Sequence, residues 1–91
     1  MNGTYALGKK IDIACQCWFT ASGDPTPIML KYKDENEEIQ TVRDIFVMRK
    51  EKLFPGCSPT TEFLCKIEFN GIERKVILKF SHSSGRWEMV I

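Results

Sequence analysis

The Asn70-Gly71 pair, with alternating apolar and polar residues on both sides, constrains the fold of this chain more than any other feature. Every second residue is apolar over 63–69, before the pair, and again over 76–80, after it. A two-residue type I′ turn needs positive φ at both central positions, and Asn-Gly adopts this conformation at least cost. Alternation with a period of two is typical of a strand with one buried face. The sequence therefore predicts a β-hairpin across the C-terminal third of the chain.

Length, composition and charge limit the class of protein. The 91 residues correspond to one domain, 1–91, in which 1–9 form a loosely ordered lead-in. A composition of 43% hydrophobic and 27% charged residues is ordinary for a globular protein, and the net charge of +1 argues against strong electrostatic capture of nucleic acid or of a membrane. We find no apolar run near the roughly 20 residues of a membrane-spanning helix, and no signal peptide at the start. We therefore expect a cytoplasmic protein that does not bind membranes and whose four cysteines are reduced thiols.

Alternation and turn-forming residues divide the chain into strands. Strands are expected over residues 10–20, 27–32, 39–50, 63–69, 75–80 and 86–91, joined by turns or loops at 21–25, 34–38, 54–60 and 81–85. Consecutive antiparallel strands of this number usually curl, because curling removes exposed sheet edges. The predicted fold class is all-β, a single small domain of five to six antiparallel strands that form an open barrel or a strongly bent sheet, SH3-like or similar.

The segment 39–53 also admits a helix. In the helical interpretation Thr41 is the N-cap, Asp44 follows three residues later, and apolar residues form one stripe. We prefer a strand to about Lys50, with a bulge or bend, because β-branched and aromatic residues dominate the segment.

The predicted core consists of the apolar residues that share one face of each strand. These are Ile11, Ile13, Cys15, Cys17, Phe19, Ile28, Leu30, Tyr32, Val42, Ile45, Val47, Phe63, Cys65, Ile67, Phe69, Val76, Leu78, Phe80, Trp87 and Met89. We expect Trp87 to close the barrel against Phe80 and Ile13.

The cysteines are more typical of core packing than of a metal site. Cys15 and Cys17 project from one strand face, and Cys57, Cys65 or His82 would have to complete a zinc tetrahedron. The spacing lacks the C-x-x-C turn of common zinc sites, and free cysteine usually packs as a small hydrophobe. Only Cys57 falls in a loop, and no neighbouring cation marks it as reactive.

The chain has no catalytic motif. His82 is the only histidine, and serines beside it in a turn do not make a triad by adjacency, so we expect a surface histidine. A phosphate-binding glycine loop, an H-E-x-x-H pair and a nucleophile elbow are all missing from the sequence. The prediction is a protein that is not an enzyme and uses no metal or cofactor.

Binding of single-stranded nucleic acid is one functional hypothesis. Small β-barrels bind single strands by stacking bases on exposed aromatic rings beside cations. Trp18 falls on the polar face of its strand, and Arg86 precedes Trp87. Possible phosphate contacts are Lys31, Lys33, Arg43, Arg49, Lys50 and Lys52.

Protein binding is the favoured alternative. Ala14, Trp18 and either Met29 or Met48 would form an apolar interaction patch if they are exposed together, and an unpaired edge strand could pair with a partner or with a second copy. We therefore predict a non-catalytic binding module, for protein rather than nucleic acid. The candidate binding surface contains Trp18, Lys31, Arg43, Arg49 and Arg86.

The order of these signals resembles a group of small uncharacterised bacterial β-domain proteins of the Firmicutes type. The similar positions are Phe19, Gly23 with Pro27, Leu30 with Tyr32, residues 47–49, residues 65–69, Leu78 with Phe80, and Gly85-Arg86-Trp87. The resemblance spans about residues 11–90, and the chain departs from it in the acidic loop 34–38 and the loop 54–60. It implies a compact β domain and assigns no activity.

Overall fold

The computed structural model describes residues 8–54, 56 and 58–91, which form seven strands and, within these ranges, no helix. The strands are β1 (Lys10–Phe19), β2 (Pro25–Lys33), β3 (Ile39–Val42), β4 (Phe46–Leu53), β5 (Thr60–Phe69), β6 (Ile72–Ser81) and β7 (Arg86–Val90). All pairings are antiparallel, so the predicted all-β class is confirmed, with one or two more strands than expected.

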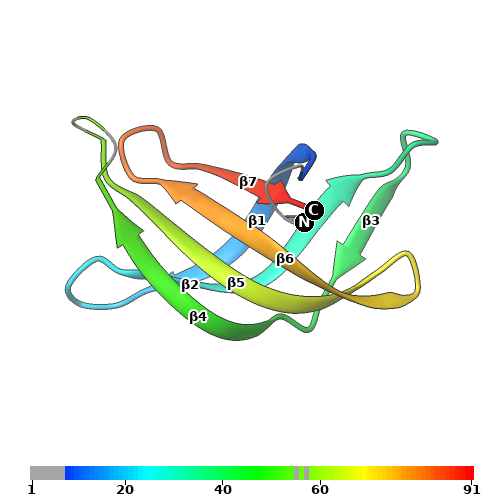
Figure 1. The fold of residues 1–91 in the computed structure, drawn as a ribbon, viewed down its shortest axis with the longest axis horizontal. Coiled ribbons are helices and arrows are strands. Elements are labelled where there is room, and N and C mark those ends of the chain that lie inside the picture. The colour runs from blue at the N-terminus through cyan, green and yellow to red at the C-terminus, as the bar shows by residue number, and fades with distance from the viewer. Residues whose placement is uncertain (1–7, 55, 57) are drawn as a thin grey trace, which may run out of the picture.

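The strand order gives the molecule its shape. In the single sheet the order is β3-β2-β1-β7-β6-β5-β4, so each strand pairs with its neighbour in sequence except β3 and β4. The first and last strands pair with each other, which is the order of an up-and-down barrel opened between β3 and β4. Figure 1 shows the result, a strongly curled half-barrel in which β4, β5 and β6 cross over β1 and β2.

The β5–β6 hairpin forms as the sequence predicts. Phe69 pairs with Ile72, and the two residues between them have positive φ, 55° at Asn70 and 79° at Gly71. This is the type I′ geometry that follows the right-handed twist of the two strands. The ladder continues to Thr60 opposite Ser81, so the hairpin is the longest paired unit of the sheet.

The core lies on the inner face of the curled sheet. Trp87 is only 7% exposed, and its ring centroid is 5.0 Å from that of Phe80 and 5.8 Å from that of Phe63. Ile13 is its cross-strand partner, so Trp87 lies between the two residues that were predicted to flank it, Phe80 and Ile13, although the barrel stays open between β3 and β4. The other buried apolar residues are Leu30, Tyr32, Val42, Cys65, Ile67, Phe69, Val76, Leu78 and Met89; Ile11, Ile13, Cys15, Cys17, Ile45 and Val47 are partly buried against them.

Two predicted core positions are wrong. Phe19 is 53% exposed, because it ends β1 near the rim of the sheet; its ring makes a T-shaped contact with Phe80 at 5.8 Å between centroids. Ile28 is half-buried, because a β-bulge pairs Gln16 with Met29 and Cys17 with Pro27, and Ile28 is the extra residue between them. Pro27 therefore takes the buried position that alternation assigned to Ile28.

The segment 39–53 forms two strands instead of one, and the helical alternative does not form. β3 ends at Val42 and pairs with β2, whereas β4 begins at Phe46 and pairs with β5. The three residues 43–45 thus carry the chain from one edge of the sheet to the other. The strand interpretation of 39–50 required a bend, and the crossing at 43–45 is where the chain bends.

Both sides of the barrel opening are protected against further strand pairing. β4 carries Arg49, Lys50 and Lys52 and has a bulge between Val47 and Arg49. β3 pairs only with the end of β2, and the uncovered start of β2 contains Pro25 and Pro27, which have no N–H to donate. Charged residues, bulges and prolines are common ways to blunt sheet edges.

Some expectations fall outside the described residues. These are most of the lead-in predicted over residues 1–9 and the loop position of Cys57. Over the part of the chain that is described, we find no helix with the length and apolar character needed to cross a membrane.

Candidate binding surface

The outer face of β1 and β2 presents an exposed tryptophan. Trp18 is 71% exposed, the highest value among the large hydrophobic residues described. It pairs with Thr26, and the next outward pair along the ladder is Gln16 with Met29. Alternation places these side chains on the face opposite to the core. Trp18 is therefore available to a partner, whereas the second tryptophan, Trp87, is buried in the core.

Three cations lie farther along the same outer face, beside the two rows that follow Trp18. Lys31 pairs with Ala14 in the next outward row, and Arg43 reaches Met29 with 3.8 Å between Nη1 and Sδ. Arg86 begins β7 and lines a shallow cleft together with Ala14. We call this area the Trp18 surface; it consists of Ala14, Gln16, Trp18, Met29, Lys31, Arg43 and Arg86. Acidic residues border it: Asp12 lines the same cleft as Arg86 and pairs with Glu88, and Asp44 follows Arg43 in the sequence.

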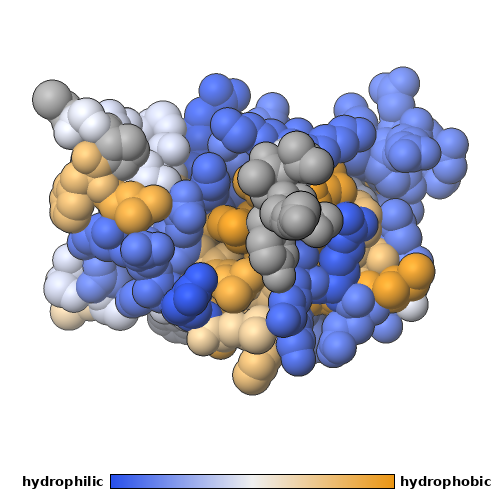
Figure 2. Space-filling view, in the orientation of Figure 1, coloured by the Kyte–Doolittle hydropathy of each residue, from blue (hydrophilic) through white to orange (hydrophobic). Residues whose placement is uncertain are grey.

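The structure thus unites four of the five predicted candidate residues, Trp18, Lys31, Arg43 and Arg86. Arg49 is not among them, because it lies on β4 opposite Leu64, at the other edge of the sheet. Of the predicted apolar patch, Ala14 and Trp18 are exposed, and Met29 lies half-buried in the row between them. Met48 is on β4 and does not belong to the patch. In the view of Figure 2, other hydrophobic residues appear in separate areas among hydrophilic ones.

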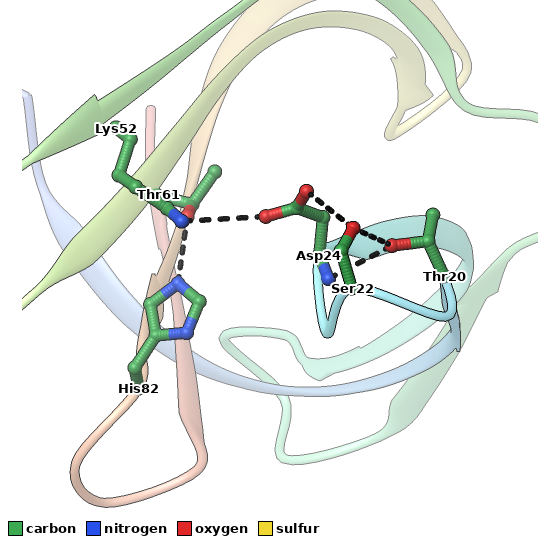
Figure 3. A network of polar contacts seen from close by, with 6 residues as sticks. All are labelled: Thr20, Ser22, Asp24, Lys52, Thr61 and His82. Atoms are coloured by element: carbon green, nitrogen blue, oxygen red, sulfur yellow. Dashed lines mark hydrogen bonds and ion pairs between the residues drawn. The ribbon is translucent and has the colours of Figure 1, made fainter.

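A polar network at the barrel opening has a structural role. The Lys52 ammonium lies 3.3 Å from the Asp24 carboxylate and holds β4 to the β1–β2 turn (Figure 3). This contact lowers the pKa of the Asp24 carboxyl, first through the hydrogen bond and then through the charge of Lys52. Within the turn, Thr20 Oγ1 accepts a hydrogen bond from the Asp24 backbone amide and shares another with the Ser22 hydroxyl. These contacts stabilise the open side of the half-barrel.

His82 is not the simple surface residue that the sequence predicts. Its Nε2 lies 2.8 Å from Thr61 Oγ1, and its ring packs edge-on against Phe80 at 4.9 Å between centroids (Figure 3). Thr61 is 2% exposed, so no substrate can reach the hydroxyl that His82 would have to activate. The pair satisfies a buried polar group. No sequence motif indicated it, because the two residues are 21 positions apart.

The cysteines of the inner face are neutral thiols. Burial raises the pKa of Cys65 to about 12, and burial together with the neighbouring cysteines raises that of Cys15 to about 12. Burial also raises the pKa of Cys17. Among the residues that the structure describes, no group of three or more His, Cys, Asp or Glu side chains is placed to hold a metal ion.

Comparisons of the chain with models of protein families, with curated proteins and with solved structures found no match. The resemblance to small bacterial β-domain proteins stays a prediction. The Trp18 surface is therefore interpreted from its own geometry and chemistry.

Proposed function

We propose that this domain is a non-catalytic module that binds another protein through the Trp18 surface. The observation that carries the proposal is the exposure of Trp18, at 71%, on an outer sheet face that it shares with Lys31, Arg43 and Arg86. An exposed tryptophan costs solvation free energy unless a partner covers it. The three cations of the Trp18 surface favour a partner whose docking face is acidic.

The composition of the surface fits a protein interface. Trp, Met and Arg are enriched at the centres of protein interfaces, and Trp and Arg are the most frequent residues whose truncation costs binding energy. Trp18, Met29 and Arg43 supply all three types within neighbouring rows. We expect Trp18 to enter an apolar pocket of the partner, while Lys31 and Arg86 contact acidic residues around it.

Single-stranded nucleic acid is the second candidate, favoured by the cations around Trp18. Proteins that bind single strands usually combine a basic groove with several aromatic platforms. The Trp18 surface has one exposed aromatic residue and lies on the outer, convex face of the half-barrel (Figure 1). This geometry favours a protein partner.

Site-specific crosslinking tests the proposal. A photoreactive amino acid replaces exposed Gln16, beside Trp18, and in a control protein it replaces exposed Lys75, on the outer face of β6. Bacterial cytosolic extract is the first source of partners, because the chain is predicted to be bacterial and cytoplasmic. We expect the Gln16 probe to give a discrete protein adduct that unlabelled wild type competes away and Trp18→Ala does not. Identical adducts from both probe positions would contradict the proposal.

Two further measurements separate the alternatives. Fluorescence anisotropy with mixed-sequence oligonucleotides over a range of salt concentrations tests the nucleic-acid candidate, since phosphate contacts make affinity strongly salt-dependent. Salt-sensitive binding that Trp18→Ala abolishes would favour nucleic acid over protein. Mass in solution at increasing concentration reports whether a second copy of the chain is the partner.

A further inference from the structure

A second candidate site lies at the end of the half-barrel, where the β5–β6 turn approaches the start of β1 and the end of β2. A cleft of about 420 Å³ opens there, within the range of small-molecule sites. The mouths of β-barrels are common places for such sites. This cleft is separate from the Trp18 surface, with which it shares no lining residue.

The floor of the cleft is aromatic and rigid. Tyr32 and Phe69 stack with 4.7 Å between ring centroids, and both are buried. The Tyr32 hydroxyl lies 3.1 Å from Oδ1 of Asn70, which fixes the amide at the cleft wall. Ile11 and Ile91 add apolar surface. A ligand that enters would therefore meet a preformed apolar wall beside the polar Asn70 amide.

Four cations line the same cleft, namely Lys9, Lys10, Lys33 and Arg74. None of them takes part in an ion pair among the residues described. The Arg74 guanidinium lies 5.7 Å from the Phe69 ring centroid, a cation–π contact that holds it over the floor and leaves its N–H donors available.

Fewer carboxylates than cations line the cleft. Asp34 and Glu35 are the acidic side chains there. Asp34 already accepts hydrogen bonds from the Asn36 and Glu38 backbone amides at 2.9 Å. Its pKa is lowered mainly by the bond from Glu38, so it serves the β2–β3 turn as a charged acceptor.

We infer that this cleft binds a small organic anion. The apolar part of the ligand would lie against Phe69, Ile11 and Ile91, and its carboxylate, phosphate or sulfonate group would accept hydrogen bonds from Arg74 and the lysines. Guanidinium groups bind such acids in bidentate geometry, and a partly enclosed site strengthens the attraction.

A pair of fluorescent probes tests this inference. Anilinonaphthalene sulfonate carries aromatic rings and an acidic group, and phenylnaphthylamine has the same rings without the charge. Because one charge-assisted hydrogen bond is worth about tenfold in affinity, we expect the sulfonate to bind about tenfold more tightly than the neutral probe. Equal affinities of the two probes would overturn the inference.

Three variants locate the binding. Arg74→Gln should weaken sulfonate binding by about tenfold, whereas Lys75→Gln, its outward-facing neighbour on β6, should leave the affinity unchanged. Asn70→Asp places a negative charge at the cleft wall; Asp tolerates the positive φ and still accepts the Tyr32 hydrogen bond, so the fold is retained. It should also weaken sulfonate binding. Equal loss in the Arg74 and Lys75 variants, or full affinity in Asn70→Asp, would show that the probe binds elsewhere.

Discussion

Ile13 of β1 pairs directly with Trp87 of β7, and this pair lies where the N-terminal strands β1 to β3 join the C-terminal strands β4 to β7 in one curled sheet. The indole of Trp87 stacks on Phe63 of β5 and packs at a tilt against Phe80 of β6, so residues from distant parts of the chain form one core. The same alternation that turns Ile13 inward turns Ala14 outward, onto the Trp18 surface.

Truncation of core residues should be costly. Ile67→Ala or Leu78→Ala should lower the free energy of unfolding by about 2–5 kcal/mol through lost burial and the cavity that remains. Ile77→Ala, on the outer face of the same strand as Leu78, should cost clearly less, because Ile77 is only half-buried. Chemical denaturation measures the stability of all three variants. An unchanged denaturation midpoint for Leu78→Ala would mean that the face of β6 assigned to the core is the wrong one.

The hairpin turn depends on Gly71. Gly71→Val should destabilise the protein by about 1–2 kcal/mol, because a β-branched residue resists the positive φ of 79°. Gly71→Asn is the control, since asparagine tolerates this region, and it should cost less. Thermal unfolding of the two variants gives the comparison; equal stability of the Val variant and wild type would reject the type I′ turn.

The hydrogen bond between Thr61 and His82 should be measurable as a coupling. Thr61→Val removes the buried hydroxyl at nearly constant volume, and His82→Phe keeps a ring against Phe80. A double-mutant cycle should give a coupling of about 0.5–1.5 kcal/mol. Strictly additive effects would mean that the two side chains do not interact in solution.

Stability should fall at alkaline pH because of the buried thiols. Cys15 and Cys65 have pKa values raised from 9.0 to about 12, so between these values the unfolded chain loses protons that the folded protein keeps. Their contribution is complete below pH 9 and is lost as the pH rises toward 12. Denaturation at several pH values should show a steeper alkaline loss for wild type than for Cys15→Ala/Cys65→Ala, and parallel curves would contradict the burial of these thiols.

The sequence was sufficient for most of the local structure. Alternation located β1, β5, β6 and β7, and Asn70-Gly71 located the turn between β5 and β6. Both signals depend on residues that are neighbours in the sequence. The break at 43–45 carries no glycine or proline, so the prediction was a bend within one strand and not a crossing between two strands. The bulge at Ile28 shifts alternation by one residue and was missed.

The candidate site was only partly predictable for a related reason. Trp18 was visible as an apolar residue on a polar strand face, which is a local signal. Its assembly with Arg86, and the separation of Arg49 from both, depend on the strand order. The pairing of β7 with β1 is long-range, and no turn between the two strands specifies it.

The central claim is that the sheet turns Trp87 inward and leaves Trp18 free to bind. Tryptophan fluorescence tests this claim most directly. In Trp87→Phe, where Trp18 alone emits, we predict red-shifted emission that acrylamide quenches almost as readily as free tryptophan. In Trp18→Phe, where Trp87 alone emits, we predict blue-shifted emission that resists quenching. Equal quenching of the two variants, or the opposite order, would contradict both the orientation of the sheet and the binding surface built on it.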